Sequence, residues 1–487
     1  MPGRAGAAGA RGRAGEAGGV IGSRSARAAL LLAWLLPLAV FALVAAAVVD
    51  VPMYDEWLWS PLVLAQHAGG LHPAALWAPQ GAHRSVVPTA LALGLARLDG
   101  WNVRIEALLS VGLVALAQLA LFALLRRRLG GTARAAGPFL PASLLLYSFV
   151  QAENWLWGFQ LSWFLVNLGA LGVVWALDER PNAPRFCLAL ACALVAGFSL
   201  VFGFATWVAG AVLLARDARR LAVWLIVGAG AAALFLVGYH LPRFENGWLG
   251  GAGAPLLDGP QFVLAYLGAP LGIGGGRWLC EALGLALLIG GGVLAARAVR
   301  AGRRPTPWLA LLAFAVVAAA CEALGRAGNG VDAALAFRYT TPASLAWIAL
   351  VGLIAEAPPA RPALVRGALV LGGVLYVIAN LAGAFEALQL AGMQRAAAAA
   401  LVDPTTADDD ELAQYENDPA FLRAQALALR AAGLGPYAPG APDAFNAARP
   451  GARAPSPSPS PCAPPSETSA YSADARTAAG TGTGRRR

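Results

Sequence analysis

Residues 28–57 read AALLLAWLLPLAVFALVAAAVVDVPMYDEW, an unbroken apolar run followed at once by acidic residues. A run of roughly 20 apolar residues can cross the hydrocarbon core of a bilayer as one helix. It is longer than the apolar part of a cleaved secretion signal, so an uncleaved anchor is expected. Charged side chains at the end of such a span survive where they face water, a partner or a substrate. The stretch therefore predicts a membrane protein with a polar site beside its first helix.

The composition of the whole chain agrees with a membrane protein. Of 487 residues, 58% are hydrophobic and only 13% are charged, so a soluble domain could not cover its surface with polar groups. The net charge of +9 comes from arginines at the ends of apolar runs, which does not suit nucleic-acid binding. The five cysteines form no CxxC pair and the four histidines lack metal-ligand spacing, so neither zinc nor a disulfide framework is predicted.

The remaining apolar runs predict an all-α polytopic membrane protein with about eleven transmembrane helices. The apolar segment 262–271 is short and is broken by Pro270, which predicts a re-entrant segment or a helix lying flat on the membrane. Gly272–Gly276 predicts a sharp turn into the next span. The expected spans lie near residues 28–49, 104–125, 138–151, 160–177, 186–200, 201–215, 221–240, 279–298, 306–324, 342–356 and 367–386.

Arginine placement predicts the sidedness of the chain. Arg126–Arg128, Arg216–Arg220 and Arg297–Arg304 lie in alternate loops, and excess arginine marks the cytoplasmic side. A multi-pass protein of the bacterial cytoplasmic membrane with a cytoplasmic N-terminus is therefore expected. Segments 57–68 and 85–98 of the first outer loop are apolar enough for interfacial helices. The outer face receives residues 50–103, 151–160, 241–278, 325–341 and the tail after 387.

Four regions are expected along the chain. Residues 1–27 form an arginine-rich, disordered cytoplasmic segment, and residues 28–390 form the transmembrane domain. Residues 391–440 form an outer helical tail, in which a short helix has Asp418 as N-cap, Pro419 at its first position and Gly433 as its stop. Residues 441–487 are rich in Pro, Ser and Ala, which is typical of disorder.

Asp55 and Glu56 are the candidate catalytic residues. A helix end passing into water would explain them more simply, but negative charge at a helix C-terminus is mildly unfavourable. The functional interpretation is a general base that takes the proton of an attacking hydroxyl. Alternatively, the carboxylates could hold a divalent cation that orients a phosphate leaving group.

Basic residues of the outer loops are candidates for phosphate binding. His83 and Arg84 precede an apolar segment, where Arg84 could either snorkel at the interface or hold a lipid phosphate with its guanidinium group. Arg326 and Arg338 offer the same chemistry in the last outer loop, with Tyr339 as a hydrogen-bonding neighbour.

A polar hairpin tip is the third candidate site. Gln151, Glu153, Asn154 and Gln160 flank two tryptophans. Such a set describes either an ordinary polar turn or a carbohydrate-binding surface, on which indole rings stack against sugars and amides read hydroxyl groups.

The pattern Tyr54-Asp55-Glu56-Trp57, then His83-Arg84, then Glu-Asn-Trp-Leu-Trp-Gly-Phe-Gln at residues 153–160, together with the interfacial helices and the number of crossings, resembles the GT-C glycosyltransferase superfamily. The likeness is to bacterial arabinofuranosyl-, mannosyl- and lipid-A-modifying transferases, and it covers about residues 28–390. It implies that an acid of the first outer loop, here Asp55 or Glu56, is the base or a metal ligand. The chain departs from such enzymes in lacking a large folded outer domain, which leaves the acceptor open.

The resemblance implies an inverting membrane glycosyltransferase. It would move a sugar from a polyprenyl-phosphate donor to an envelope glycan or lipid on the outer face, with Arg84, Arg326 and Arg338 on the donor phosphate. The alternatives are a transporter or flippase of a lipid-linked saccharide, and a non-catalytic scaffold of envelope assembly. No internal repeat of the kind that transporters show is evident.

Overall fold

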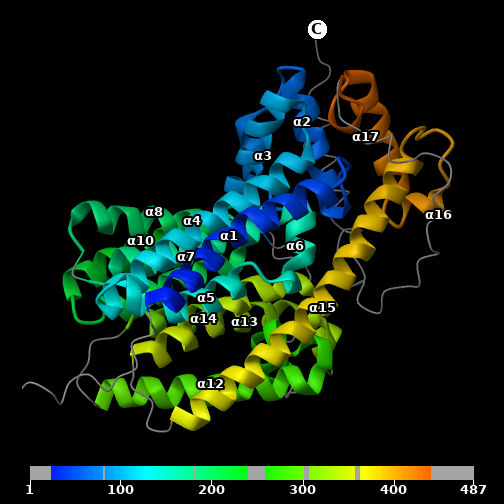
Figure 1. Cartoon of the computed structure of the whole chain (residues 1–487). Coiled ribbons are helices and arrows are strands. Elements are labelled where there is room, and N and C mark those ends of the chain that lie inside the picture. Colours follow the sequence, from blue (N-terminus) through cyan, green and yellow to red (C-terminus); the bar gives the residue numbers. More distant parts are fainter. Residues whose placement is uncertain are drawn as a thin grey trace, which may run out of the picture.

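The computed structural model describes residues 23–80, 83–179, 181–239, 258–300, 306–356 and 362–439 (Figure 1). Within these ranges the regular structure is helical, and the only extended pairing is an isolated bridge between Gln80 and His83. The predicted all-α class is therefore confirmed. The segment 441–487 and most of 1–27, both predicted to be disordered, lie outside the described residues.

Nine stretches of helix in the described residues are long and apolar enough to cross a membrane. Two shorter apolar helices, α8 (Ala183–Gly197) and α9 (Ala205–Leu214), lie where short spans are predicted. The chain is thus an all-α polytopic membrane protein, and eleven crossings remain a prediction. The long helices are α1 (Ser23–Ala47), α4 (Val103–Leu129), α5 (Thr132–Leu146), α7 (Leu161–Leu177), α10 (Ala218–Leu236), α12 (Arg277–Arg300), α13 (Pro307–Arg326), α14 (Thr340–Glu356) and α15 (Pro362–Ala400).

The helices divide into a buried core and a lipid-facing periphery. Helices α4, α5, α7, α13 and α14 pack together and are more buried than the other long helices. Helices α1, α10, α12 and α15 expose rows of large apolar side chains, and α12 and α15 run along one side of the bundle (Figure 1). A continuous apolar surface of that kind belongs against lipid rather than water.

Helix α11 (Asp258–Gly272) contains the short apolar segment that Pro270 interrupts. It is buried along most of its length and packs against α12, α13 and α14, and its placement relative to the membrane stays a prediction. The approach to α12 is close, since a Cβ added at Gly268 would come within 1.8 Å of the Cys280 carbonyl oxygen. Between the two helices, η6 (Ile273–Gly275) and Gly276, with φ of 80°, make the predicted glycine turn.

The segment between α1 and α4 is helical where the sequence predicts it; it and the other loops predicted to share its side of the membrane keep the name outer loops. After α1 come η1 (Tyr54–Trp59), α2 (Ser60–His67), η2 (Pro73–Trp77) and α3 (Val86–Asp99). Gly100 ends α3 with φ of 75°, a left-handed conformation that glycine adopts without strain. The loop is thus an ordered layer at the end of the bundle.

Helix α15 continues beyond the membrane span predicted at 367–386. Its 39 residues extend for about 58 Å at 1.5 Å per residue, against a hydrocarbon core of about 30 Å. It also runs without a break through the domain boundary expected after residue 390. Asp418 caps the helix that starts at Pro419 and stops at Gly433, as predicted.

The tail then folds back onto the first outer loop. We call this part of the tail the C-terminal cap; it comprises α16 (Asp409–Leu412), α17 (Pro419–Ala432), η10 (Gly435–Tyr437) and the residues between them. Figure 1 shows α17 beside α2, and the two helices are in contact.

Candidate functional site

The backbone of η1 separates the acidic doublet into two environments. Asp55 and Glu56 are consecutive residues of a 3-10 helix, which directs successive side chains about 120° apart. Glu56 is 1% exposed and points into the core, whereas Asp55 is partly exposed. Tyr54, which opens the helix, has φ of 46°, an uncommon conformation for a tyrosine. The two acids therefore cannot share one role.

Glu56 is held in the interior by few polar contacts. Its Oε2 accepts the Met53 N–H over 3.2 Å, and its carboxyl group also interacts with the carboxyl group of Glu106. Gly158 lies directly against it, since a Cβ there would come within 2.8 Å of Oε1. Burial raises the pKa of Glu56 to about 8. The carboxyl group is therefore protonated near neutral pH.

Two more buried acids lie near Glu56, and neither was singled out from the sequence. Asp50 accepts the Val103 N–H over 3.0 Å, and burial raises its pKa to about 7. Glu106, in the first turn of α4, is 1% exposed, and its carboxyl group interacts with that of Glu56 and with Trp101. Both are lone acids at the ends of apolar runs, which is the signal that could have identified them.

The described parts of the chain contain no group of three or more His, Cys, Asp or Glu side chains that could hold a metal ion. One or two carboxylates can bind a divalent cation together with the phosphate of a substrate, so the divalent cation allowed for from the sequence stays a prediction.

An ion pair links two of the predicted site residues. Arg338 Nη1 lies 2.9 Å from Glu153 Oε1, and the Arg338 N–H donates to Glu153 Oε2 over 3.0 Å. Glu153 belongs to α6 (Ala152–Leu156) and Arg338 to η9 (Phe337–Tyr339). The pair thus joins the hairpin tip to the last outer loop, and both side chains remain partly exposed.

Amide side chains of the hairpin tip form hydrogen bonds beside this ion pair. Asn154 Nδ2 donates to the Arg338 carbonyl oxygen over 2.9 Å and to Thr341 Oγ1 over 2.7 Å. Thr341 Oγ1 in turn donates to Gln151 Oε1 over 2.7 Å. Gln151, Asn154 and Gln160 are all at least 97% buried. Their position favours a structural role over direct contact with a sugar.

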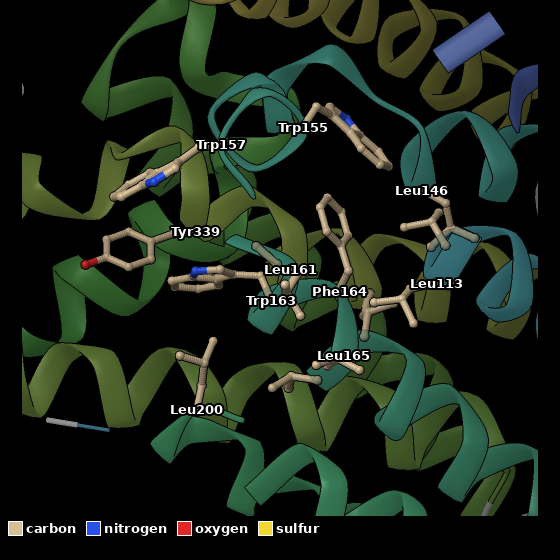
Figure 2. Close-up of a cluster of buried hydrophobic side chains, with 14 of the residues drawn as sticks. Leu113, Leu146, Trp155, Trp157, Leu161, Trp163, Phe164, Leu165, Leu200 and Tyr339 are labelled. Carbon is tan, nitrogen blue, oxygen red and sulfur yellow. The ribbon is translucent and has the colours of Figure 1, made fainter. Parts of the chain in front are cut away.

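The tryptophans of the hairpin are also interior residues. Figure 2 shows Trp155 over Phe164, and their ring centroids lie 4.4 Å apart. Trp155 is fully buried and donates its Nε1–H to the Ser148 carbonyl oxygen over 3.1 Å. Its ring therefore packs within the protein and is not presented to a ligand in this structure.

Tyr339 lies between the two arginines of the last outer loop. The guanidinium carbon of Arg338 is 5.2 Å from the centre of its ring, and that of Arg326 is 5.9 Å away. Arg326 also pairs with Glu322 over 3.2 Å. His83 is close enough to Arg326 to interact electrostatically, and burial and that charge lower the pKa of His83 to about 3. His83 is thus neutral, and its Nδ1 accepts the Val201 N–H over 3.2 Å.

Asp55 completes the arrangement from the first outer loop. It lies within electrostatic range of Arg338, which therefore interacts with two acids, Asp55 and Glu153. Tyr54 reaches the same region, with its ring 5.4 Å from that of Trp157. We call Asp55, Glu153, Arg326 and Arg338 the outer charged cluster, in which both acids interact with Arg338 and both arginines lie near Tyr339. The structure brings these predicted residues together from three separate outer segments.

Arg84 lies apart from this cluster in its contacts. Its guanidinium group donates to three backbone carbonyl oxygens: those of Trp77, of Phe235 over 2.6 Å and of Val237 over 2.5 Å. The side chain is 1% exposed. These bonds fasten the outer end of α10 to the first outer loop, an arrangement that favours structural support.

Glu416 is a neighbour of Asp55 that the sequence analysis did not select. It lies between α16 and α17 in the C-terminal cap, is 3% exposed and interacts electrostatically with Asp55. Only the packing of the cap on the first outer loop reveals this proximity. The acidic run at residues 408–411 is evident in the sequence of the tail, but nothing in the sequence distinguishes Glu416.

A surface depression of about 440 Å³ lies elsewhere on the molecule. It is lined by Phe186, Asp217, Arg219, Arg220 and Val223, at the start of α10. Arg84 binds the other end of the same helix, which has 19 residues, about 28 Å away along its axis. None of the residues that line the depression belongs to the outer charged cluster.

Comparison with protein-family models, with curated proteins and with solved structures gave no match. The chemistry of the outer charged cluster is thus the basis for a functional proposal.

Proposed function

We propose that the chain is an inverting membrane glycosyltransferase of the GT-C type, acting on the outer face of the cytoplasmic membrane. It would transfer a sugar from a polyprenyl-phosphate donor to an envelope glycan or lipid acceptor. The observation that carries the proposal is the proximity of a partly exposed carboxylate, Asp55, to the guanidinium group of Arg338. An acid to accept a proton and a cation to bind a phosphate are the two groups that such a transfer needs.

In the proposed reaction Asp55 takes the proton of an acceptor hydroxyl group. The hydroxyl oxygen attacks the anomeric carbon as the bond from that carbon to the phosphate oxygen breaks. The electron pair leaves with polyprenyl phosphate, and a single displacement inverts the anomeric carbon. Arg338 and Arg326 would stabilise the charge that develops on the phosphate, since fixed cations aimed at a leaving group lower the barrier.

The proposal gives Glu56 a different role from Asp55. A buried, protonated carboxyl group cannot take a proton from a substrate that binds at the surface. Glu56 is instead proposed to position η1, through its bond to Met53, so that Asp55 faces Arg338. His83 and Tyr339 are proposed to position Arg326 and Arg338 and not to bind the sugar donor directly.

A transporter of a lipid-linked saccharide remains the second candidate. The specific observation in its favour is the group of buried acids at the ends of α1 and α4, in which Glu56 and Glu106 interact with each other. Buried carboxyl groups at membrane helices are typical proton carriers. On this alternative Asp50, Glu56 and Glu106 would take up and release protons as the substrate moves.

One experiment separates the two candidates. Purified protein is incubated with a panel of radiolabelled polyprenyl-phosphate sugars and envelope acceptors, and free polyprenyl phosphate is measured. A transferase releases it together with a labelled glycan or glycolipid. A transporter reconstituted in vesicles moves the intact donor across the bilayer, and that movement without bond cleavage would overturn the transferase proposal.

A further inference from the structure

The C-terminal cap rests directly on the loop that carries Asp55. The Tyr54 N–H donates to the Tyr415 carbonyl oxygen over 2.7 Å. Ser60 Oγ donates to Gln425 Oε1 over 3.2 Å. Two main-chain segments and two helices distant in sequence are thereby joined, as the position of α17 beside α2 shows (Figure 1).

The bond between Tyr54 and Tyr415 brings two acids together. Asp55 and Glu416 are the residues that follow each partner, and they interact electrostatically. Glu416 is 3% exposed, and its Oε2 has no hydrogen-bond partner among the described residues. Two carboxylates in such a setting repel each other when both are ionised, which favours the protonated form of the buried Glu416.

We propose that Glu416 is a further positioning residue of the outer site, and that its proton holds the C-terminal cap in place against Asp55. The assignment to a catalytic site rests on the proposed function, whereas the seating of the cap does not. Ionisation of Glu416 puts a second negative charge beside Asp55 and loosens the cap. The cap is thus a pH-sensitive cover of the acid that the first outer loop presents.

The charges around Glu416 set the direction of this effect. Burial, together with the charges of Asp55 and Asp418, raises the pKa of Glu416 from 4.5 to about 7, and hydrogen bonds from the Asp418 and Asn417 backbone act in the opposite direction. Two further charged groups lie nearby: Arg338 interacts electrostatically with Asp55, and Glu153 interacts electrostatically with Tyr54. A raised pKa means that the seated cap binds the proton more tightly than the open one. The free energy by which this proton stabilises the contact between the C-terminal cap and the first outer loop is therefore fully present below pH 4.5. It declines as the pH rises to about 7.

Hydrogen exchange of the full-length protein in nanodiscs tests the proposal without any sugar donor. Exchange of the peptides that cover η1 and residues 415–425 is measured from pH 4.5 to 8 and corrected for intrinsic rates. Protection should fall by at least about tenfold between pH 5 and 7 in the natural protein. It should stay level in Glu416→Gln. Asp410→Asn, which alters an exposed acid of the same cap, should behave like the natural protein.

A second variant tests the link between the two acids. Asp55→Asn removes the neighbouring charge, so protection should fall less and level off at a lower pH. The same pH dependence in Glu416→Gln as in the natural protein would overturn the proposal. An unchanged curve in Asp55→Asn would also overturn it, because the cap would then be indifferent to Asp55. Neither outcome depends on whether the protein transfers sugars.

Discussion

Glu153 and Arg338 are joined twice, by an ion pair of 2.9 Å between their side chains and by a bond of 3.0 Å from the Arg338 N–H to the same carboxylate. This double contact connects the hairpin tip before α7 to the loop before α14. It also fixes the guanidinium group near Asp55. The outer charged cluster depends on this one junction more than on any single helix.

The junction should appear as an energetic coupling. Glu153→Gln and Arg338→Gln are each expected to lower the free energy of unfolding by about 1–3 kcal/mol, because each leaves a partly buried charge without its partner. The double variant should be less destabilised than the sum of the two. Unfolding in mixed SDS micelles measures the cycle. Strict additivity would mean that the pair contributes nothing.

Gly158 should not tolerate a side chain. A Cβ there would come within 2.8 Å of Glu56 Oε1 and 2.9 Å of the Val103 carbonyl oxygen. Gly158→Ala is therefore expected to destabilise the protein by about 1–3 kcal/mol through overpacking. Gly112→Ala is the matched control, since nothing lies within 4 Å of its Cβ position. Equal stability of the two variants would show that η1 does not pack as described.

The stability of the protein should depend on pH through Glu56. Its pKa is raised from 4.5 to about 8, so the folded state binds the proton more tightly than the unfolded state. The corresponding stability is complete below pH 4.5 and is lost as the pH rises to about 8. Glu56→Gln should therefore unfold with a shallower dependence on pH between 5 and 8. Melting temperatures across this range test it, with Asp410→Asn as the exposed control; parallel curves would contradict it.

Arg84 should behave as a structural residue. Arg84→Ala leaves the carbonyl oxygens of Trp77, Phe235 and Val237 without their donor, which is expected to lower the free energy of unfolding by at least about 2 kcal/mol. Arg84→Lys should rescue little, because an ammonium group cannot reproduce the geometry of a guanidinium fork. Arg97→Ala, at an exposed position of α3, serves as control. A stable Arg84→Ala protein with weaker binding of polyprenyl phosphate would instead support the phosphate role predicted from the sequence.

The helices were predictable because a span needs only a local property, a long apolar run. The predicted segment 104–125 lies within α4 and the segment 160–177 contains α7 for this reason, and Asp418 and Gly433 mark the ends of α17 through local hydrogen bonds. The burial of α11 was not predictable, since it depends on packing against α12, α13 and α14, which a short apolar segment with Pro270 does not specify.

The sequence identified most residues of the candidate site, but it did not indicate the role of each. The acids and arginines of the outer loops were identified because charge is rare in this chain. The separation of Asp55 from Glu56 was not, since it depends on the 3-10 geometry of η1. The proximity of Glu416 to Asp55 was also hidden, because it arises from a contact between segments about 360 residues apart.

The most direct test of the proposed function is the release of polyprenyl phosphate from a radiolabelled donor by Asp55→Asn. The account predicts a loss of at least about 100-fold relative to the natural protein, with folding and membrane insertion intact and with Asp410→Asn unaffected. Full release by Asp55→Asn in a protein that otherwise turns over would contradict it.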